Sequence, residues 1–203
     1  QAQWYDLVDV LRLHIDALEE DAGSYRTGLL LKVGRLAIEK TQDADLAIDS
    51  LNMVLEVEPN HGDALSGLAD LHSSNGDWEQ AAEMLQKALE NVEGEQQSPL
   101  FIRLGDLYTK QLGREEEGIR FYEEALAESD SSDAIDALLQ YYRRSGDTGQ
   151  LEILLGLKLN LVVGLERAEA LGELGLIRYE QGDYENAVTS LAEAQAARPD
   201  SLE

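Results

Sequence analysis

The amino-acid sequence predicts an all-α fold: a right-handed α-solenoid of about five helix-turn-helix repeats with one further helix in front. A position that is usually small recurs along the chain at spacings of 35, 36, 34 and 36 residues. A short turn and a second amphipathic segment follow each occurrence. Prolines number three in 203 residues, 43% of which are hydrophobic, so long helices and a sizeable core are both possible. A period of this length is typical of stacked helix pairs.

The recurring position lies in the first helix of each repeat and is held by Gly34, Ala69, Gly105, Leu139 and Gly175. The predicted turns are Asp43 to Asp45, Gly76-Asp77, Gly113-Arg114, Gly146-Asp147 and Gly182-Asp183. Gly34 to Ala47 and Gly105 to Gly118 both span 13 residues, where the other repeats give 12. We therefore expect one extra residue in the turns of repeats one and three.

The second helices carry an apolar stripe that contains small residues. The clearest sets are Ala81/Leu85/Ala88, Gly118/Tyr122/Ala125 and Ala187/Leu191/Ala194. Positions i, i+4 and i+7 share one helix face. The turn should reverse the chain between two antiparallel helices, and Ala81 should let the second helix lie close against the first.

These patterns divide the chain into a single array. The expected elements are a leading helix at 4–19 and repeats at about 24–60, 61–95, 97–130, 132–164 and 167–201. Repeat four departs from the pattern, with Leu151, Leu155 and Lys158 in its second helix, and this helix is similar to the leading one. We therefore expect the leading helix to be the second helix of an incomplete repeat, and the chain to be a segment of a longer protein.

The repeats resemble the tetratricopeptide repeat family over about residues 24–201. The best matches to its signature are Leu104-Gly105, Tyr108, Tyr122 and Ala125, then Leu174-Gly175, Gly182-Asp183-Tyr184, Ala187, Leu191, Ala194 and Pro199. The resemblance implies a protein-binding module whose first helices line a concave groove. It also implies that prolines close repeats, as Pro59 and Pro199 would.

The inner positions of the family predict the residues of a partner-binding groove. They are Asp63, Ser66, Asp70 and Ser73 in repeat two, Ile102, Asp106 and Thr109 in repeat three, and Asp136, Gln140 and Arg143 in repeat four. Leu31 and Arg35 hold these positions in repeat one. A basic or Ser/Thr-rich extended segment would suit this acidic stripe. The alternative is that the aspartates are solvated charge on a chain that is acidic throughout.

Charge and motif content exclude several function classes. The formal charge is 16 − 41 = −25, which repels phosphate backbones and anionic lipid, so we expect no nucleic-acid partner. No run of eighteen apolar residues exists, so we expect no membrane insertion. His14, His61 and His72 lack metal-ligand spacing, and the sequence has no phosphate loop, no serine nucleophile motif and no cysteine. We expect no cofactor, no metal and no enzymatic activity.

We therefore expect a scaffold that binds a protein or peptide partner, with a basic segment as the best fit. One alternative is a structural module that self-associates through open apolar ends at 4–15 and 188–194. Another is a non-catalytic adaptor within a larger protein. The absence of cysteine fits the cytoplasm and the periplasm equally.

Overall fold

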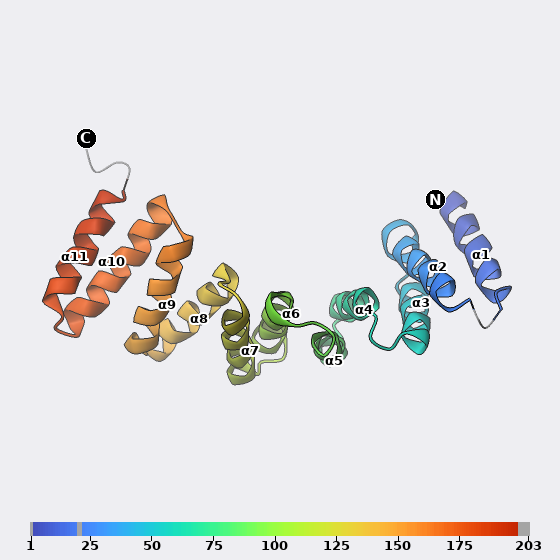
Figure 1. Cartoon of the computed structure of the whole chain (residues 1–203), viewed down its shortest axis with the longest axis horizontal. Helices are drawn as coiled ribbons and strands as arrows, with labels where there is room; N and C mark the ends of the chain where they lie inside the picture. Colours follow the sequence, from blue (N-terminus) through green and yellow to red (C-terminus); the bar gives the residue numbers. More distant parts are fainter. Residues whose placement is uncertain (1, 20–21, 199–203) are drawn as a thin grey trace. The chain divides into compact units, whose positions relative to one another are not determined.

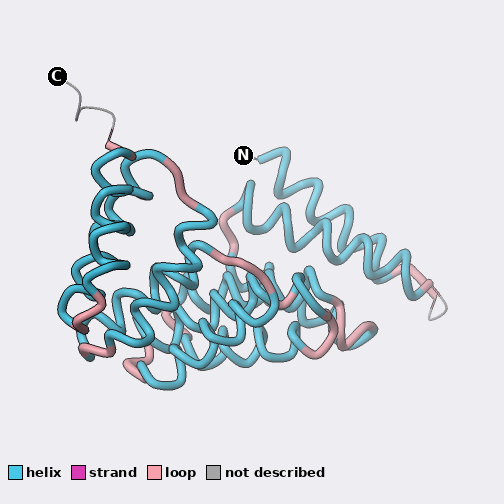
Figure 2. The backbone as a smooth tube through the Cα atoms, turned by 60° about the vertical axis from the view of Figure 1, so that its left-hand side comes forward, coloured by secondary structure: helices cyan, strands magenta, loops and turns pink. Residues whose placement is uncertain are grey.

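The computed structural model describes residues 2–19 and 22–198, which are helices joined by short loops (Figures 1 and 2). The α-helices are α1 (Ala2–Asp16), α2 (Gly23–Leu36), α3 (Ala44–Val57), α4 (Gly62–Asn75), α5 (Trp78–Leu89), α6 (Ser98–Asp106), α7 (Glu115–Glu128), α8 (Ser132–Ser145), α9 (Thr148–Leu161), α10 (Gly164–Glu180) and α11 (Tyr184–Ala196). Short π-helical segments, η1 (Ala37–Thr41) and η3 (Leu107–Gln111), extend α2 and α6, and a 3-10 turn, η2 (Gly94–Gln96), precedes α6. The described residues contain no strand. The predicted all-α helical-repeat fold is confirmed.

The chain divides into two compact units. Unit 1 comprises Gln1–Gln96 with Lys110–Gly113, and unit 2 comprises Gln97–Thr109 with Arg114–Glu203. Unit 1 contains α1 to α5, and unit 2 contains α6 and α7 to α11. Whether the five predicted repeats form one array stays a prediction.

Unit 1 is built from the pairs α2/α3 and α4/α5, with α1 packed against α2. Its core is aliphatic and comes from four helices: Val8, Leu11 and Ile15 of α1, Leu30 and Val33 of α2, Leu51 and Val54 of α3, and Leu68 of α4. On α5, Ala81 is fully buried and Leu85 is 1% exposed. These apolar faces follow the helical period, so burial removes a continuous stripe from water on each helix.

Unit 2 repeats this arrangement with the pairs α6/α7, α8/α9 and α10/α11. Its core includes Tyr122 and Ala125 of α7, Ile135, Leu138 and Leu139 of α8, Leu155 of α9 and Leu174 of α10. Leu139, which stands at the recurring small position, is fully buried. Repeat four therefore buries a leucine at the position where the other repeats have glycine or alanine.

Glycine at the recurring position brings the paired helices close together. A Cβ added to Gly105 would lie 2.6 Å from the ring of Tyr122, and one added to Gly175 would lie 2.7 Å from Leu191 Cγ. A Cβ at Gly34 would lie 3.3 Å from a methyl carbon of Leu51. In these three pairs the large residue of the second helix therefore packs directly on the backbone of the first helix.

Each helix pair turns through a residue in the left-handed conformation. This residue is Gly76, Gly113, Gly146 or Gly182 in four repeats and Gln42, with φ of 56°, in repeat one. The amide that follows it donates back to the first helix: Asp77 to His72 at 2.9 Å and Asp183 to Arg178 at 2.9 Å. This arrangement satisfies carbonyls that a helix end leaves without partners.

The extra residue of repeats one and three lies in the first helix, not in the turn as the sequence analysis expected. The bond that closes the turn joins residues six apart there, Asp43 to Ala37 at 3.0 Å and Arg114 to Tyr108 at 2.8 Å. In the other repeats it joins residues five apart. The π-helical segments η1 and η3 occupy these places because a wider backbone ring takes up one residue.

Two prolines were expected to close repeats. Pro59 follows the end of α3 at Val57 by two residues, as a residue that cannot continue a helix should. Pro199 lies outside the described residues. Within residues 2–19 and 22–198, no helix combines the length and the apolar character that crossing a membrane requires.

Candidate partner-binding groove

A groove of about 830 Å³ lies in unit 1 along the first helices of repeats one and two. Both α2 and α4 contribute a wall, η1 contributes two residues and α3 contributes one. The lining residues are Gly28, Leu31, Lys32, Arg35, Leu36, Ile38, Glu39, Leu51, Asp63, Ser66, Gly67 and Asp70. The volume is within the range in which proteins hold small ligands or a short stretch of peptide.

Two glycines line the groove, and their surroundings differ. A Cβ added to Gly28 would meet no atom within 4 Å, whereas one added to Gly67 would lie 3.0 Å from Leu51 Cδ1. A larger side chain at Gly28 would therefore extend into the groove, whereas Leu51 already packs against Gly67. Glycine is a poor helix former, so Gly28 lowers the stability of α2. The absence of a side chain at this position leaves space in the groove.

Three of the predicted groove residues lie on the α4 wall. Asp63, Ser66 and Asp70 are separated by three and four residues, so they share one helix face. From the α2 side, the groove includes Leu31 and Arg35, the inner positions expected for repeat one. Ser73 is not among the lining residues, and its hydroxyl donates to the carbonyl of Ala69 at 2.7 Å.

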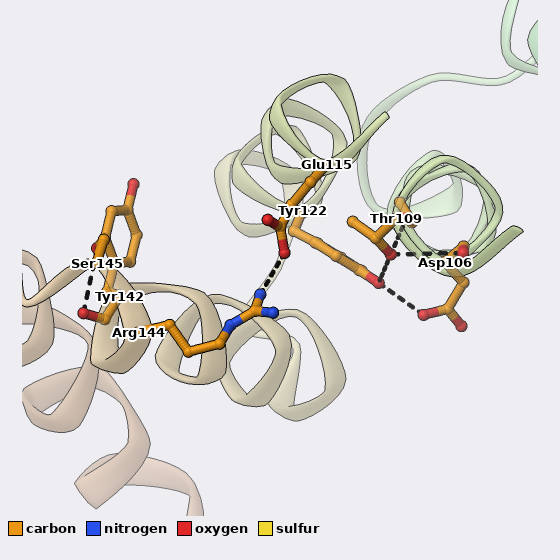
Figure 3. A network of polar contacts seen from close by, with 8 residues as sticks. Asp106, Thr109, Glu115, Tyr122, Tyr142, Arg144 and Ser145 are labelled. Carbon is orange, nitrogen blue, oxygen red and sulfur yellow. Dashed lines mark hydrogen bonds and ion pairs between the residues drawn. The ribbon is translucent and has the colours of Figure 1, made fainter. Parts of the chain in front are cut away.

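The predicted residues of repeat three lie in unit 2, and two of them, Asp106 and Thr109, form a polar network with Tyr122 (Figure 3). The hydroxyl of Tyr122 donates to Asp106 Oδ1 at 2.6 Å and is 3.4 Å from Thr109 Oγ1. Thr109 Oγ1 also donates to the carbonyl of Gly105 at 2.7 Å. Burial and the bond to Asp106 raise the pKa of Tyr122 well above its usual value. Asp106 and Thr109 therefore contribute to the contact between α6 and α7.

The predicted residues of repeat four are also engaged within unit 2. Lys158 on α9 donates to Asp136, and Arg143 on α8 makes two bonds to the Glu173 carboxylate, at 2.7 and 2.5 Å. The bonds to Glu173 raise the pKa of Arg143. These charges are partly neutralised inside the unit, so they attract a partner less strongly than unpaired charges would.

Two predicted residues of unit 2 lie outside these polar contacts. Ile102 is half-buried and packs against the core of the unit, and Gln140 is exposed on α8. The structure thus brings together Asp63, Ser66 and Asp70 in one groove. It places the other predicted residues in separate local surroundings.

Seven residues that line the groove were not predicted from the sequence: Gly28, Lys32, Leu36, Ile38, Glu39, Leu51 and Gly67. Lys32, Leu36 and Gly67 each directly follow an inner position, so a search one residue wider would have found these three. No group of three or more His, Cys, Asp or Glu side chains in the described ranges could hold a metal ion.

Family models described as Tetratricopeptide repeat match residues 39–98, 98–130 and 123–201. Solved structures with a similar fold include a MamA protein, with 20% identity, a TM-score of 0.58, and coverage of 84% of this chain and 91% of that chain. YrrB, a TPR protein with an unusual peptide-binding site, has 17% identity, a TM-score of 0.53, and coverage of 86% and 87%. BtubC from P. vanneervenii has 18% identity, a TM-score of 0.52, and coverage of 97% and 88%.

Proposed function

Since this chain belongs to the tetratricopeptide repeat family, we propose that it is a protein-interaction scaffold that holds a partner segment in the groove between α2 and α4. The observation that carries the proposal is the position of Asp63, Ser66 and Asp70 together along one wall of this groove. The peptide-binding site of YrrB, which has the same fold, supports choosing a peptide-like occupant.

Carboxylates on the α4 wall favour a partner with Lys or Arg side chains. Asp63 and Asp70 are exposed, so each can form an ion pair at the rim without a large desolvation cost. The formal charge of −25 also draws a basic partner towards the chain over distances of about 10 Å at moderate salt. Capture should therefore be faster at low ionic strength.

The groove is proposed as a binding site without a chemical step. Tetratricopeptide arrays are generally non-catalytic scaffolds. Binding in a groove of this kind requires complementary shape and charge, and the residues that line it supply both.

The proposal is tested by affinity capture from lysate of the source organism at low and at high salt. The chain is compared with the double variant Asp63→Asn and Asp70→Asn, which removes two charges from the groove. We expect the variant to retain several-fold less of a basic partner at low salt, and high salt to reduce capture by the natural chain. The helical circular-dichroism signal should stay unchanged.

The matched control is Glu90→Gln with Glu124→Gln, which removes the same charge from exposed residues outside the groove. If both double variants lose the partner equally, the effect is one of net charge, and the groove is not the binding site. If neither loses it, the partner binds another surface and the proposal is wrong.

Self-association is a second candidate function, favoured by exposed apolar side chains on two helices. On α1, Tyr5, Val10 and Leu13 are 49%, 61% and 69% exposed. On α11, Tyr184 and Val188 are 63% and 67% exposed. Such faces bind apolar surfaces, which a second copy of the chain provides. Sedimentation equilibrium tests this: a mass that rises with concentration and falls for Leu13→Glu would support it, and a monomer at all concentrations would oppose it.

A further inference from the structure

We infer that the groove between α2 and α4 selects a segment in which an apolar side chain stands between one acidic and one basic residue. The inference rests on the proposed function and defines the chemistry of the partner. It comes from the distribution of charge across the groove, which the overall acidity of the chain conceals.

The two walls of the groove carry opposite charge. Lys32 and Arg35, three residues apart on α2, contribute the positive side, and Asp63 and Asp70 on α4 contribute negative charge. With Glu39, the lining carries two positive and three negative side chains, a formal charge of 2 − 3 = −1. The whole chain carries −25. The groove is therefore close to neutral on a strongly acidic protein, and it selects for the arrangement of charge rather than for its amount.

The positive side chains can reach a ligand. The side chain of Arg35 is 78% exposed, and its contact to Glu39 is long at 3.9 Å. Lys32 is exposed and forms no ion pair with any residue in the described part of the chain. A wholly basic segment would place like charges against both residues, whereas an acidic side chain on that side would pair with them.

Apolar side chains also line the groove. They are Leu31 and Leu36 of α2, Ile38 of η1 and Leu51 of α3, and Ile38 is 45% exposed. Gly28 leaves room beside the backbone of α2, because a Cβ there would meet no atom within 4 Å. An apolar side chain of the partner would bury surface here, which supplies affinity that exposed ion pairs alone do not.

The test uses a displayed library of random twelve-residue peptides, selected on the natural chain and on the variant Gly28→Leu. Leucine at this position fills the groove but should not harm the helix, because its Cβ meets no atom within 4 Å and Leu is the better helix former. Gly156→Leu is the matched control, since Gly156 is exposed on α9 with the same open surroundings. Thermal unfolding of both variants verifies that they fold.

We expect peptides that bind the natural chain and Gly156→Leu but not Gly28→Leu, and expect them to carry an apolar residue between an acidic and a basic one. Replacing the acidic residue by glutamine should weaken binding about two- to fivefold, as the loss of an exposed ion pair does. The same replacement should have no effect on binding to the double variant Lys32→Gln and Arg35→Gln.

Two results would overturn the inference, and they differ in what they imply for the proposed function. Groove-dependent peptides that are basic and contain no acidic residue would contradict the divided-charge selection while leaving groove binding intact. A selection in which no peptide depends on the groove, so that Gly28→Leu and Gly156→Leu enrich the same sequences, would contradict both.

Discussion

The hydroxyl of Tyr122 on α7 donates a hydrogen bond of 2.6 Å to Asp106 Oδ1 on α6 (Figure 3). In the other clear second helices the equivalent position holds an aliphatic residue, such as Leu85 or Leu191. The ring of Tyr122 fills the same space against Gly105 that leucine fills elsewhere. The α6/α7 pair therefore adds a polar contact to the packing that all pairs share.

Replacing Tyr122 by phenylalanine removes this contact and retains the ring. We expect the free energy of unfolding to fall by about 1–2 kcal/mol, because a hydrogen bond to a carboxylate in a half-buried place is lost. Urea denaturation followed by circular dichroism measures the change. Tyr142→Phe is the comparison: its hydroxyl donates to Glu123 at 2.8 Å on an exposed surface, and its loss should change stability by less than about 0.5 kcal/mol. Equal losses of stability in the two variants would show that burial does not increase the contribution of the Tyr122 hydrogen bond to the free energy of unfolding.

High pH should weaken the fold through the same tyrosines. Burial and the bond to Glu123 raise the pKa of Tyr142 from its usual value of 10.0 to about 12, and burial and the bond to Asp106 raise the pKa of Tyr122 as well. The folded chain thus keeps these protons where the unfolded chain loses them, so the stabilisation is present below pH 10 and is lost as the pH rises through 12. Absorbance titration of phenolate should show a late-ionising fraction among the eight tyrosines. Tyr122→Phe with Tyr142→Phe should remove it; a late fraction that persists would refute the assignment.

Glycine positions should respond to alanine in opposite directions. At Gly118 an added Cβ would lie 2.9 Å from the carbonyl oxygen of Gly105 and 3.0 Å from the amide nitrogen of Thr109, both backbone atoms that cannot move aside cheaply. We expect Gly118→Ala to cost about 1–3 kcal/mol. Gly28→Ala should instead stabilise by about 0.5–1 kcal/mol, because its surroundings are open and alanine favours the helix. Thermal and urea unfolding distinguish them, and stabilisation by Gly118→Ala would contradict the packing described.

The turn of repeat one should be improved by glycine. Gln42 adopts φ of 56°, a conformation that glycine holds in the other four turns. Gln42→Gly should raise the free energy of unfolding by about 0.5–1 kcal/mol and the Tm by about 1–4 °C, because the strain of a side chain in this region is relieved. Gln42→Ala keeps that strain and should not stabilise. A lower Tm for Gln42→Gly, measured by calorimetry, would show that the flexibility it gives the unfolded chain outweighs the relief of strain.

Much of the fold could be predicted from the sequence because its signals are local. The period of Gly34, Gly105 and Gly175 and the stripes such as Ala81/Leu85/Ala88 specify which faces pack, and the glycines of four turns mark where the chain reverses. The position of the extra residue in repeats one and three was not predictable in this way. Spacing alone shows that a residue has been added, but it does not distinguish a longer turn from a wider helical ring. That difference depends on backbone hydrogen bonds such as the one from Asp43 to Ala37.

The candidate site was only partly accessible to sequence reasoning. The inner positions place Asp63, Ser66 and Asp70 on one helix face, and these three residues line one groove. The contacts of Asp136 with Lys158 and of Arg143 with Glu173 join residues 22 and 30 positions apart, and which long side chains meet across helices is not encoded in a repeat pattern. The contribution of Gly28 and Gly67 was missed because an absent side chain becomes visible only when neighbouring helices enclose the space.

The π-helical segments at the ends of α2 and α6 bear on how genes for such chains change. When a codon is added at the end of a first helix, the extra residue is taken up by a wider, π-helical backbone ring. The turn and the second helix can then keep their positions relative to the first helix. Repeats of unequal length can therefore be duplicated, lost or exchanged within one gene without rebuilding the surfaces at which neighbours meet.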